Sequence, residues 1–304
     1  MEKLKTLTTE QRNESSMHID HLPTMDILKI INEEDRTVTE KVHEVLPEIG
    51  KTIDVLCQSM KKGGKLFYVG AGTSGRIGIL DAVECPPTFS TPPDLIQAVM
   101  AGGDGAFRQA VEGAEDDEAQ GAADLQERGV TELDVVIGIA ASGRTPYVVG
   151  ALKHAQEIGA TSVSLTSNKH AKISRYADIK IEVLTGPEIL TGSTRLKAAS
   201  AHKLILNMIT TTTMIKIGKV YENLMVDVKV SNYKLKERAK SIISTITSVS
   251  NEEAERVLNE TNHEVKPAIV MLKTGVSYAE ARQLIAQAEG FVHQAIALVD
   301  ETKK

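Results

Sequence analysis

The stretch KLFYVGAGTSGRIGILDAVECPPTFS, residues 65 to 90, joins a short apolar run, a glycine-rich turn and a helix-like segment. The apolar run, residues 66 to 69, has the aromatic and β-branched character of a buried strand. The turn and the helix start are made by Gly70, Gly72, Thr73, Ser74 and Gly75. Free N–H groups, the positive end of the helix dipole and two hydroxyls meet there, so we expect an anionic ligand.

The same stretch also matches the dinucleotide-binding fingerprint GxGxxG over residues 70 to 75. A nucleotide site of that kind has an acidic residue about 20 positions on, at the end of the second strand, where it holds a ribose. The corresponding region here is CPPTFS, residues 85 to 90, and no strand ends in such a carboxylate. A small phosphate ester is therefore favoured over a nucleotide.

The composition is that of a globular protein, with 304 residues, 41% hydrophobic and 25% charged. This length suits one large domain and a smaller one. The net charge of −6 lacks the positive footprint of a nucleic-acid binder, so local donors have to hold an anion.

Cysteine and histidine spacing predicts no metal site. Cys57 and Cys85 fit neither a disulfide nor a metal framework, and the eight histidines show no ligand spacing. The first 20 residues are polar, and no apolar run reaches the length of a membrane span. We expect a cytoplasmic protein with no membrane or nucleic-acid partner.

Beyond the first loop, strand-like and helix-like patterns alternate. Strands are expected at 95–100, 134–140, 162–166 and 179–184, and helices at 105–113, 116–128, 146–158 and 193–217. This alternation predicts the α/β class, with a doubly wound parallel sheet covered on both faces. Ligands of such sheets bind beyond the carboxyl ends of the strands.

We expect three parts along the chain. Residues 1–56 form an N-terminal helical segment, with helices from residue 24 and over about 35–62, the second kinked at Pro47. Residues 57–248 form the sheet domain. Residues 249–304 form a small all-helical domain, with helices at 251–258, 265–273, 278–288 and 291–299.

Two further loops resemble the first in composition. The second contains Ser142, Gly143 and Thr145, and the third contains Ser193 and Thr194, each before a predicted helix. Hydroxyl- and glycine-rich loops at strand ends can converge on one phosphate. The alternative is that these residues only cap their helices. Each loop also carries an arginine that either reaches the anion or lies at the surface: Arg76, Arg144 and Arg195.

Two carboxylates lie near predicted turns. Glu84 precedes Pro86 and Pro87, which are expected to end the helix. Glu115 lies at a glycine-punctuated junction, where it is either a catalytic group or a helix-start carboxylate favoured by the dipole. No GxSxG elbow occurs, which disfavours a nucleophile-triad enzyme.

The chain resembles the N-acetylmuramic acid 6-phosphate etherases, a family built on the sugar isomerase (SIS) domain. The motifs that carry the resemblance are Gly70-Ala-Gly-Thr-Ser-Gly-Arg-Ile-Gly78, Glu84-Cys-Pro-Pro-Thr-Phe89, Glu112-Gly-Ala-Glu-Asp116, Ala141-Ser-Gly-Arg-Thr145, Gly192-Ser-Thr-Arg-Leu-Lys-Ala198, Asn223-Leu-Met-Val-Asp227, Leu7-Thr-Thr-Glu-Gln-Arg-Asn13 and Ile31-Asn-Glu-Glu-Asp35. They run from the N-terminus to about residue 240, and the motif at 84–89 distinguishes the etherases from ordinary sugar isomerases.

The resemblance implies a carbon–oxygen lyase of cell-wall amino-sugar recycling. Its reaction cleaves the D-lactyl ether of N-acetylmuramic acid 6-phosphate and gives N-acetylglucosamine 6-phosphate and D-lactate. In the family, the residue matching Glu84 is the proton donor, and the one matching Glu115 is the partner carboxylate. No cofactor or metal is required, and related SIS domains form homodimers.

Two other functions stay open on the same scaffold, namely an aldose–ketose isomerase and a non-catalytic sugar-phosphate sensor. A geometric tension also stays open. In an unbroken helix Glu84 lies about 15 Å beyond Ser74, farther than a sugar phosphate is expected to reach. Either the helix bends early, or Glu84 serves a site that a second subunit completes.

Overall fold

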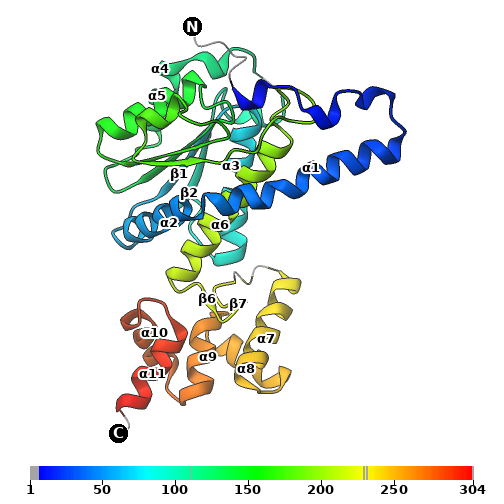
Figure 1. The fold of residues 1–304 in the computed structure, drawn as a ribbon. Coiled ribbons are helices and arrows are strands. Elements are labelled where there is room, and N and C mark those ends of the chain that lie inside the picture. Colours follow the sequence, from blue (N-terminus) through cyan, green and yellow to red (C-terminus); the bar gives the residue numbers. More distant parts are fainter. Residues whose placement is uncertain (1–6, 110, 229, 231, 303–304) are drawn as a thin grey trace. The chain divides into compact units, whose positions relative to one another are not determined.

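The computed structural model describes residues 7–109, 111–228, 230 and 232–302. The chain divides into two compact units (Figure 1). The first contains residues 1–82 and 93–210, and the second contains residues 83–92 and 211–304. Two helices, α3 (Gly72–Phe89) and α6 (Lys197–Lys216), pass from one unit into the other.

A parallel five-stranded sheet forms the centre of the first unit, which confirms the predicted α/β class. Its strands are β1 (Leu66–Gly70), β2 (Ile96–Met100), β3 (Val135–Ile139), β4 (Thr161–Thr166) and β5 (Ile179–Glu182). Their order is β2-β1-β3-β4-β5. The order reverses between β1 and β3, where Gly70 lies opposite Ile139. Doubly wound sheets bind their ligands at such a switch point.

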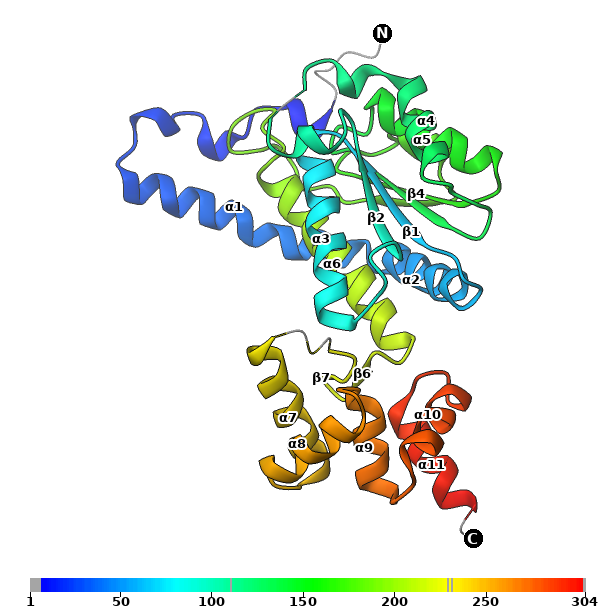
Figure 2. The ribbon, with the colours of Figure 1, turned by 180° about the vertical axis from the view of Figure 1, so that it is seen from behind.

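Helices cover both faces of this sheet (Figure 2). On one face, α4 (Glu118–Glu127) and α5 (Pro146–Glu157) pack on alternate strand residues such as Phe67 and Val69. On the other face, Asp81 of α3 accepts hydrogen bonds from Tyr68 of β1 (2.8 Å), Asn207 of α6 (2.7 Å) and Thr210 of α6 (3.1 Å). This buried carboxylate therefore ties α3 and α6 to the central strand.

The N-terminal helices differ from the prediction. The structure has α1 over Thr24–Glu44 and α2 over Leu46–Lys61, so the break lies at Val45 instead of near residue 35. Pro47 does not kink a longer helix, because it occupies the first turn of α2. Proline costs no helical hydrogen bond there, and its fixed φ suits a helix start.

Two other predicted boundaries were wrong. Pro86 and Pro87 do not end α3, which continues to Phe89. They fall in its last turn, so only the hydrogen bonds back to Ala82 and Val83 are lost. Over 105–113 the structure has only a short 3₁₀ turn, Asp104–Phe107, and Ala110 lies outside the described residues. Gly105 and Gly113, the two glycines of that stretch, disfavour a regular helix.

The second unit is helical apart from a short hairpin that the sequence did not predict, β6 (Val220–Tyr221) with β7 (Leu224–Met225). Its helices are α7 (Tyr233–Thr247), α8 (Asn251–Glu260), α9 (Val265–Thr274), α10 (Tyr278–Gln287) and α11 (Val292–Thr302). Residues of α7 such as Ile243 share one core with α8 and α9. The division therefore falls near residue 210, upstream of the expected boundary at 248/249.

Gly150 and Gly50 provide a matched test of how closely α4 and α5 pack. A Cβ on Gly150 would lie 1.7 Å from the backbone oxygen of Glu118, whereas a Cβ on Gly50 of α2 would have nothing within 4 Å. We expect Gly150→Ala to lower the free energy of unfolding by at least about 2 kcal/mol, because the two helices must separate. Gly50→Ala should raise it by up to about 1 kcal/mol, since alanine favours helix. Chemical denaturation of both variants measures the difference, and equal stabilities would contradict it.

Candidate functional site

A cavity of about 290 Å³ in the first unit contains residues from two of the predicted motifs. Gly72 and Arg76 line it from the first turn of α3, and Glu112 and Glu115 line it from the segment after β2. The cavity lies beyond the carboxyl ends of β1 and β2. The structure thus places the turn that is predicted to bind an anion and one of the two candidate carboxylates around one space.

The first turn of α3 has backbone donors to spare. The N–H groups of Ser74 and Gly75 donate to the carbonyl of Ala71, at 3.1 and 3.3 Å. Within the described residues, no hydrogen bond uses the N–H of Gly72 or Thr73. These two amides lie at the positive end of an 18-residue helix and are suited to bind an anion.

The second loop follows β3, beside the first. Thr145 is the N-cap of α5 but makes no capping hydrogen bond, so its hydroxyl is not used by the helix. Ser142 Oγ accepts a hydrogen bond from the N–H of Arg144 at 3.3 Å. A Cβ on Gly143, which has a φ of +68°, would lie 2.3 Å from Ala171 Cβ. Only glycine therefore lets this loop lie so close to the segment after β4.

The third loop precedes α6, which begins at Lys197 instead of the predicted Ser193. Its first amides are already occupied. The buried carboxylate of Glu188 accepts hydrogen bonds from the N–H groups of Lys197 and Ala198, both at 2.9 Å. Burial raises the pKa of Glu188, against the effect of these two hydrogen bonds. Ser193 and Thr194 are therefore not the caps of this helix, and an anion near them would be held by hydroxyls.

The N-terminal segment connects the second and third loops, which sequence reasoning did not predict. Asn168 accepts from the N–H of Thr8 (2.8 Å) and donates to Thr9 Oγ1 (3.1 Å) and to the carbonyl of Ala141 (3.0 Å). The carbonyl of the fully buried Thr9 accepts from the N–H of Gly192 (3.2 Å). Thr8 and Thr9 thus hold together the loops after β3, after β4 and before α6.

Asn13 continues this connection on the outer side. Its amide nitrogen donates to Glu34 Oε2 of α1 at 2.9 Å and to the carbonyl of Pro187 at 3.2 Å. Glu34 in turn pairs with the buried Lys197 Nζ at 2.5 Å. Hydrogen bonding and the charge of Lys197 lower the pKa of Glu34, although burial opposes this. Three motifs of the etherase resemblance, at 7–13, 31–35 and 192–198, therefore meet in one polar network.

Glu84 belongs to the second unit, just beyond the division in α3. Its side chain is exposed, as is that of Glu115. Helix α3 is unbroken from Gly72 to Phe89, so Glu84 lies about 15 Å along its axis from Ser74. The helix therefore does not end early, and the explanation by a second subunit stays a prediction.

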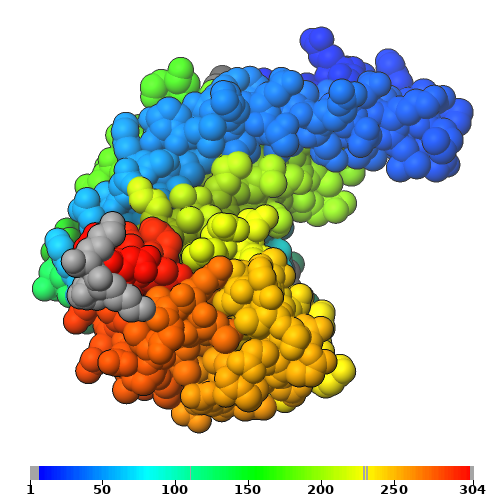
Figure 3. All heavy atoms as spheres, turned by 90° about the horizontal axis from the view of Figure 1, so that it is seen from below, coloured from blue at the N-terminus to red at the C-terminus, as the bar shows by residue number. Residues whose placement is uncertain are grey.

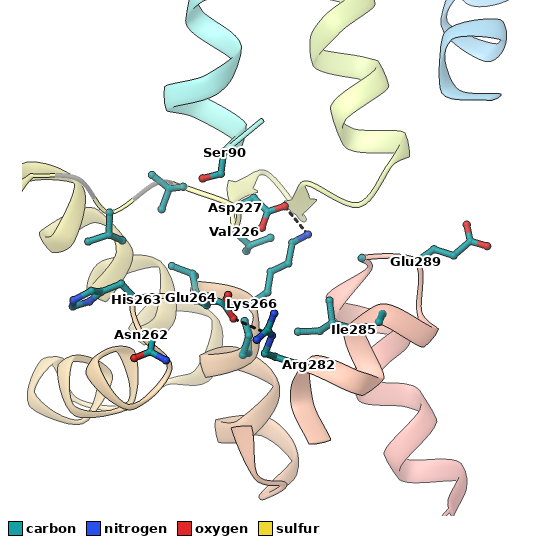
Figure 4. Close-up of a pocket in the computed structure, with 16 residues that line it drawn as sticks. Ser90, Val226, Asp227, Asn262, His263, Glu264, Lys266, Arg282, Ile285 and Glu289 are labelled. Atoms are coloured by element: carbon teal, nitrogen blue, oxygen red, sulfur yellow. Dashed lines mark ion pairs between the residues drawn. The ribbon is translucent and has the colours of Figure 1, made fainter. Parts of the chain in front are cut away.

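A larger cavity, of about 710 Å³, lies in the second unit (Figure 4). Its two prominent cations already have carboxylate partners. Lys266 Nζ lies 2.7 Å from Asp227, and Arg282 Nε lies 3.6 Å from Glu264. No residue of the predicted phosphate loops lines this cavity, so we do not assign the site to it.

Neither a metal-binding cluster nor a membrane-spanning helix is found in the parts of the chain that are described. No group of three or more His, Cys, Asp and Glu side chains is arranged to hold a metal ion in residues 7–109, 111–228, 230 and 232–302. In the same residues, every helix is too short or too polar to cross a membrane.

Three family models match successive parts of the chain. The N-terminal SIS domain of the glucokinase regulatory protein matches residues 48–156, and the general SIS domain matches residues 117–211. The C-terminal lid domain of the glucokinase regulatory protein matches residues 222–267. The last match begins before α7, in agreement with the division into two units.

Similar curated proteins cover nearly the whole chain. An N-acetylmuramic acid 6-phosphate etherase 1 of Bacillus licheniformis is 56% identical over 98% of this chain and 98% of its own length. The etherase of Bacillus subtilis is 55% identical over 96% of both. This chain belongs to the N-acetylmuramic acid 6-phosphate etherase family. The etherase of Clostridioides difficile, at 48% identity over 98% of both chains, extends the family to a more distant relative.

Solved structures agree with the SIS fold of this etherase-family chain. A phosphoheptose isomerase from Francisella tularensis superposes with a TM-score of 0.52 at 19% identity, covering 64% of this chain and all of its own. A phosphoheptose isomerase from Neisseria gonorrhoeae gives 0.50 at 18% identity, covering 63% of this chain and 99% of its own. At these identities the likeness shows the fold alone.

The buried His202 of α6 is expected to make the stability of the first unit depend on pH. Its Nε2 lies 3.1 Å from Ser167 Oγ, in the loop after β4, and burial lowers its pKa to about 3. The unfolded chain protonates this histidine near pH 6.5, so the stabilisation is complete above that pH and is lost as the pH falls toward 3. We expect the free energy of unfolding to fall by up to about 1.4 kcal/mol per pH unit from this group.

His202→Gln should reduce that slope, because glutamine keeps a polar group near Ser167 but does not titrate. Denaturant titrations at several pH values between 4 and 7 measure the slope for both proteins. Identical slopes would show that His202 is not the titrating group.

Proposed function

We propose that this chain cleaves the D-lactyl ether of N-acetylmuramic acid 6-phosphate to N-acetylglucosamine 6-phosphate and D-lactate. The observation that carries the proposal is 56% identity to a curated etherase over 98% of both chains. The first unit supports it with an open helix start and Glu115 around one cavity. The reaction would serve the recycling of cell-wall amino sugars.

The chemistry explains why two carboxylates suffice. In the ring-opened sugar, the C2 proton is acidic because C1 is an aldehyde, and the ether oxygen on C3 is a β leaving group. A base removes the C2 proton, the C3–O bond breaks, and an acid protonates the departing lactate oxygen. Water then adds to C3 of the enal, and C2 takes up a proton. Each such proton transfer contributes about 10²- to 10⁴-fold to the rate.

We assign the acid to Glu84 and the base to Glu115. The phosphate would be held by Gly72, Thr73, Ser74 and Gly75 of the first loop, with Ser142, Gly143 and Thr145 of the second and Ser193 and Thr194 of the third. The unused amides of Gly72 and Thr73 and the Thr145 hydroxyl, which makes no capping hydrogen bond, support this assignment over simple helix capping. The first and second loops follow the carboxyl ends of β1 and β3. The third loop is connected to that edge of the sheet through the hydrogen bond between Gly192 and Thr9.

Glu84 has to hold a proton near neutrality to act as an acid. Burial or a nearby negative charge favours the protonated form of a carboxyl group. This chain leaves the Glu84 side chain exposed, so burial by its own surroundings is not the source. The negative charge of the bound substrate, or contact with a second subunit, would then have to favour the protonated form.

A homodimer with shared active sites accounts for the position of Glu84 along α3. The first unit exposes apolar side chains on three connected helices: Met25 (62%), Leu28 (52%), Leu80 (48%) and Met208 (37%). A hydrogen bond from Asn207 to Asp81 connects α6 with α3, and an ion pair between Lys197 and Glu34 connects α6 with α1. Figure 3 shows the blue atoms of α1 at the surface of the first unit. A second copy would cover this surface.

The cytoplasm is the compartment that we propose, since the cysteine usage of the sequence suits a reducing environment. An aldose–ketose isomerase and a sugar-phosphate sensor are the competing functions, and the curated etherases at 48–56% identity favour neither.

A lactate assay on the purified protein separates the three functions. With N-acetylmuramic acid 6-phosphate we expect D-lactate release and, in D₂O, deuterium at C2 of the product. A ketose product would indicate the isomerase, and binding without turnover would indicate the sensor. Turnover without deuterium at C2 would contradict the elimination step.

Glu84→Gln and Glu115→Gln should each lose about 10²- to 10⁴-fold in kcat and keep near-normal substrate binding, because each removes one proton transfer. Mixed after subunit exchange, the two variants should regain about one quarter of the wild-type activity. Half of the randomly formed dimers are then mixed, and each has one intact site. No recovery in verified mixed dimers would rule out shared sites.

A further inference from the structure

The guanidinium of Arg76 makes two hydrogen bonds within the protein. It begins in the first turn of α3, next to the proposed phosphate amides. Its Nε donates to the carbonyl of Phe107 at 2.9 Å, and one Nη donates to the carbonyl of Ala106 at 2.8 Å. Two donors of one rigid planar group therefore bind two consecutive backbone oxygens.

These carbonyls belong to the segment that connects β2 with α4 and carries Glu115. The described part of this segment has little regular structure, with the 3₁₀ turns Asp104–Phe107 and Ala114–Asp116. It leaves the sheet where the N–H of Ala101 donates to Gly70 (3.1 Å). Ala106, 2% exposed, is the buried residue of its first turn.

Gly102 shows how tightly the segment folds back on itself. Its φ is +84°, and a Cβ there would lie 2.9 Å from Val111 Cβ and 3.2 Å from Ala106 Cβ. Gly102 thus lies close both to the turn that Arg76 binds and to Val111, and Ala106, Val111, Glu112 and Glu115 line one cavity. A displacement of Ala106 would be passed on to the carboxylates.

We infer that Arg76 is a positioning residue, which holds the Glu115 segment at a set place relative to the first turn of α3. This inference rests on the function proposed above. In that function, Arg76 would set the distance between the amides proposed to bind the phosphate and the proposed base, Glu115. The guanidinium lines the same cavity as Gly72 and Glu115 and connects its two sides. Its role is therefore alignment of the base rather than binding of the phosphate.

Arg76→Ala tests the inference, with Arg108→Ala as the matched control. Arg108 is an exposed arginine of the same segment whose side chain makes no hydrogen bond or ion pair within the described residues. We expect Arg76→Ala to lose about 10- to 100-fold in kcat with a KM within about threefold of wild type, because a misplaced base slows the chemistry. Guanidinium ion at millimolar concentration should restore part of the kcat. Arg108→Ala should match the wild type.

A raised KM with normal kcat would overturn the inference and make Arg76 a phosphate ligand. An unchanged kcat in Arg76→Ala would also overturn it. So would a loss of kcat that guanidinium does not rescue, if the variant also unfolds at a lower temperature than the wild type. Amide hydrogen exchange of residues 101–116 provides a readout independent of turnover. It should rise several-fold in Arg76→Ala without substrate, and unchanged protection would refute the clamp even if the wild type proved not to be an etherase.

Discussion

The close contact between the end of β1 and the first turn of α3 is the constraint on which the candidate site depends. A Cβ on Gly70 would lie 2.7 Å from the N of Gly75, and a Cβ on Gly75 would lie 2.9 Å from the Gly70 oxygen and 2.7 Å from Met100 Cγ. Only glycine fits at both positions. Because β1 is paired on both sides, by β2 and β3, this contact holds the open end of α3 beside the switch point of the sheet.

Much of the fold was predictable because its signals are local. The apolar run 66–69 and the turn at Gly70 and Gly75 define a strand, a loop and a helix within a dozen residues, and periodicity located the helices beyond residue 251 to within a few positions. The α/β class follows from such a pattern. Local signals failed where context decided, as at Pro47 and Pro86, since a proline's effect depends on its place within the helix.

The parts of the site that could not be predicted are made by contacts between distant residues. Thr9 meets Asn168 and Gly192 only after the chain has folded, and its own sequence context is an ordinary polar stretch. Arg76 could be placed in the first turn of α3, but its acceptors are backbone carbonyls, which any sequence offers. The two family motifs that contain Asn13 and Glu34 indicated importance without showing that the residues touch.

The starts of α3 and α6 show where an anion is more readily held. Glu188 places a carboxylate of the chain itself on the first amides of α6, so a phosphate there would have to displace it or lie against its negative charge. The described residues leave the first two amides of α3 without such an occupant. A chain of net charge −6 attracts an anion only through local donors of this kind. The start of α3 is therefore the better candidate for the phosphate that we propose, because Glu188 already occupies the first amides of α6.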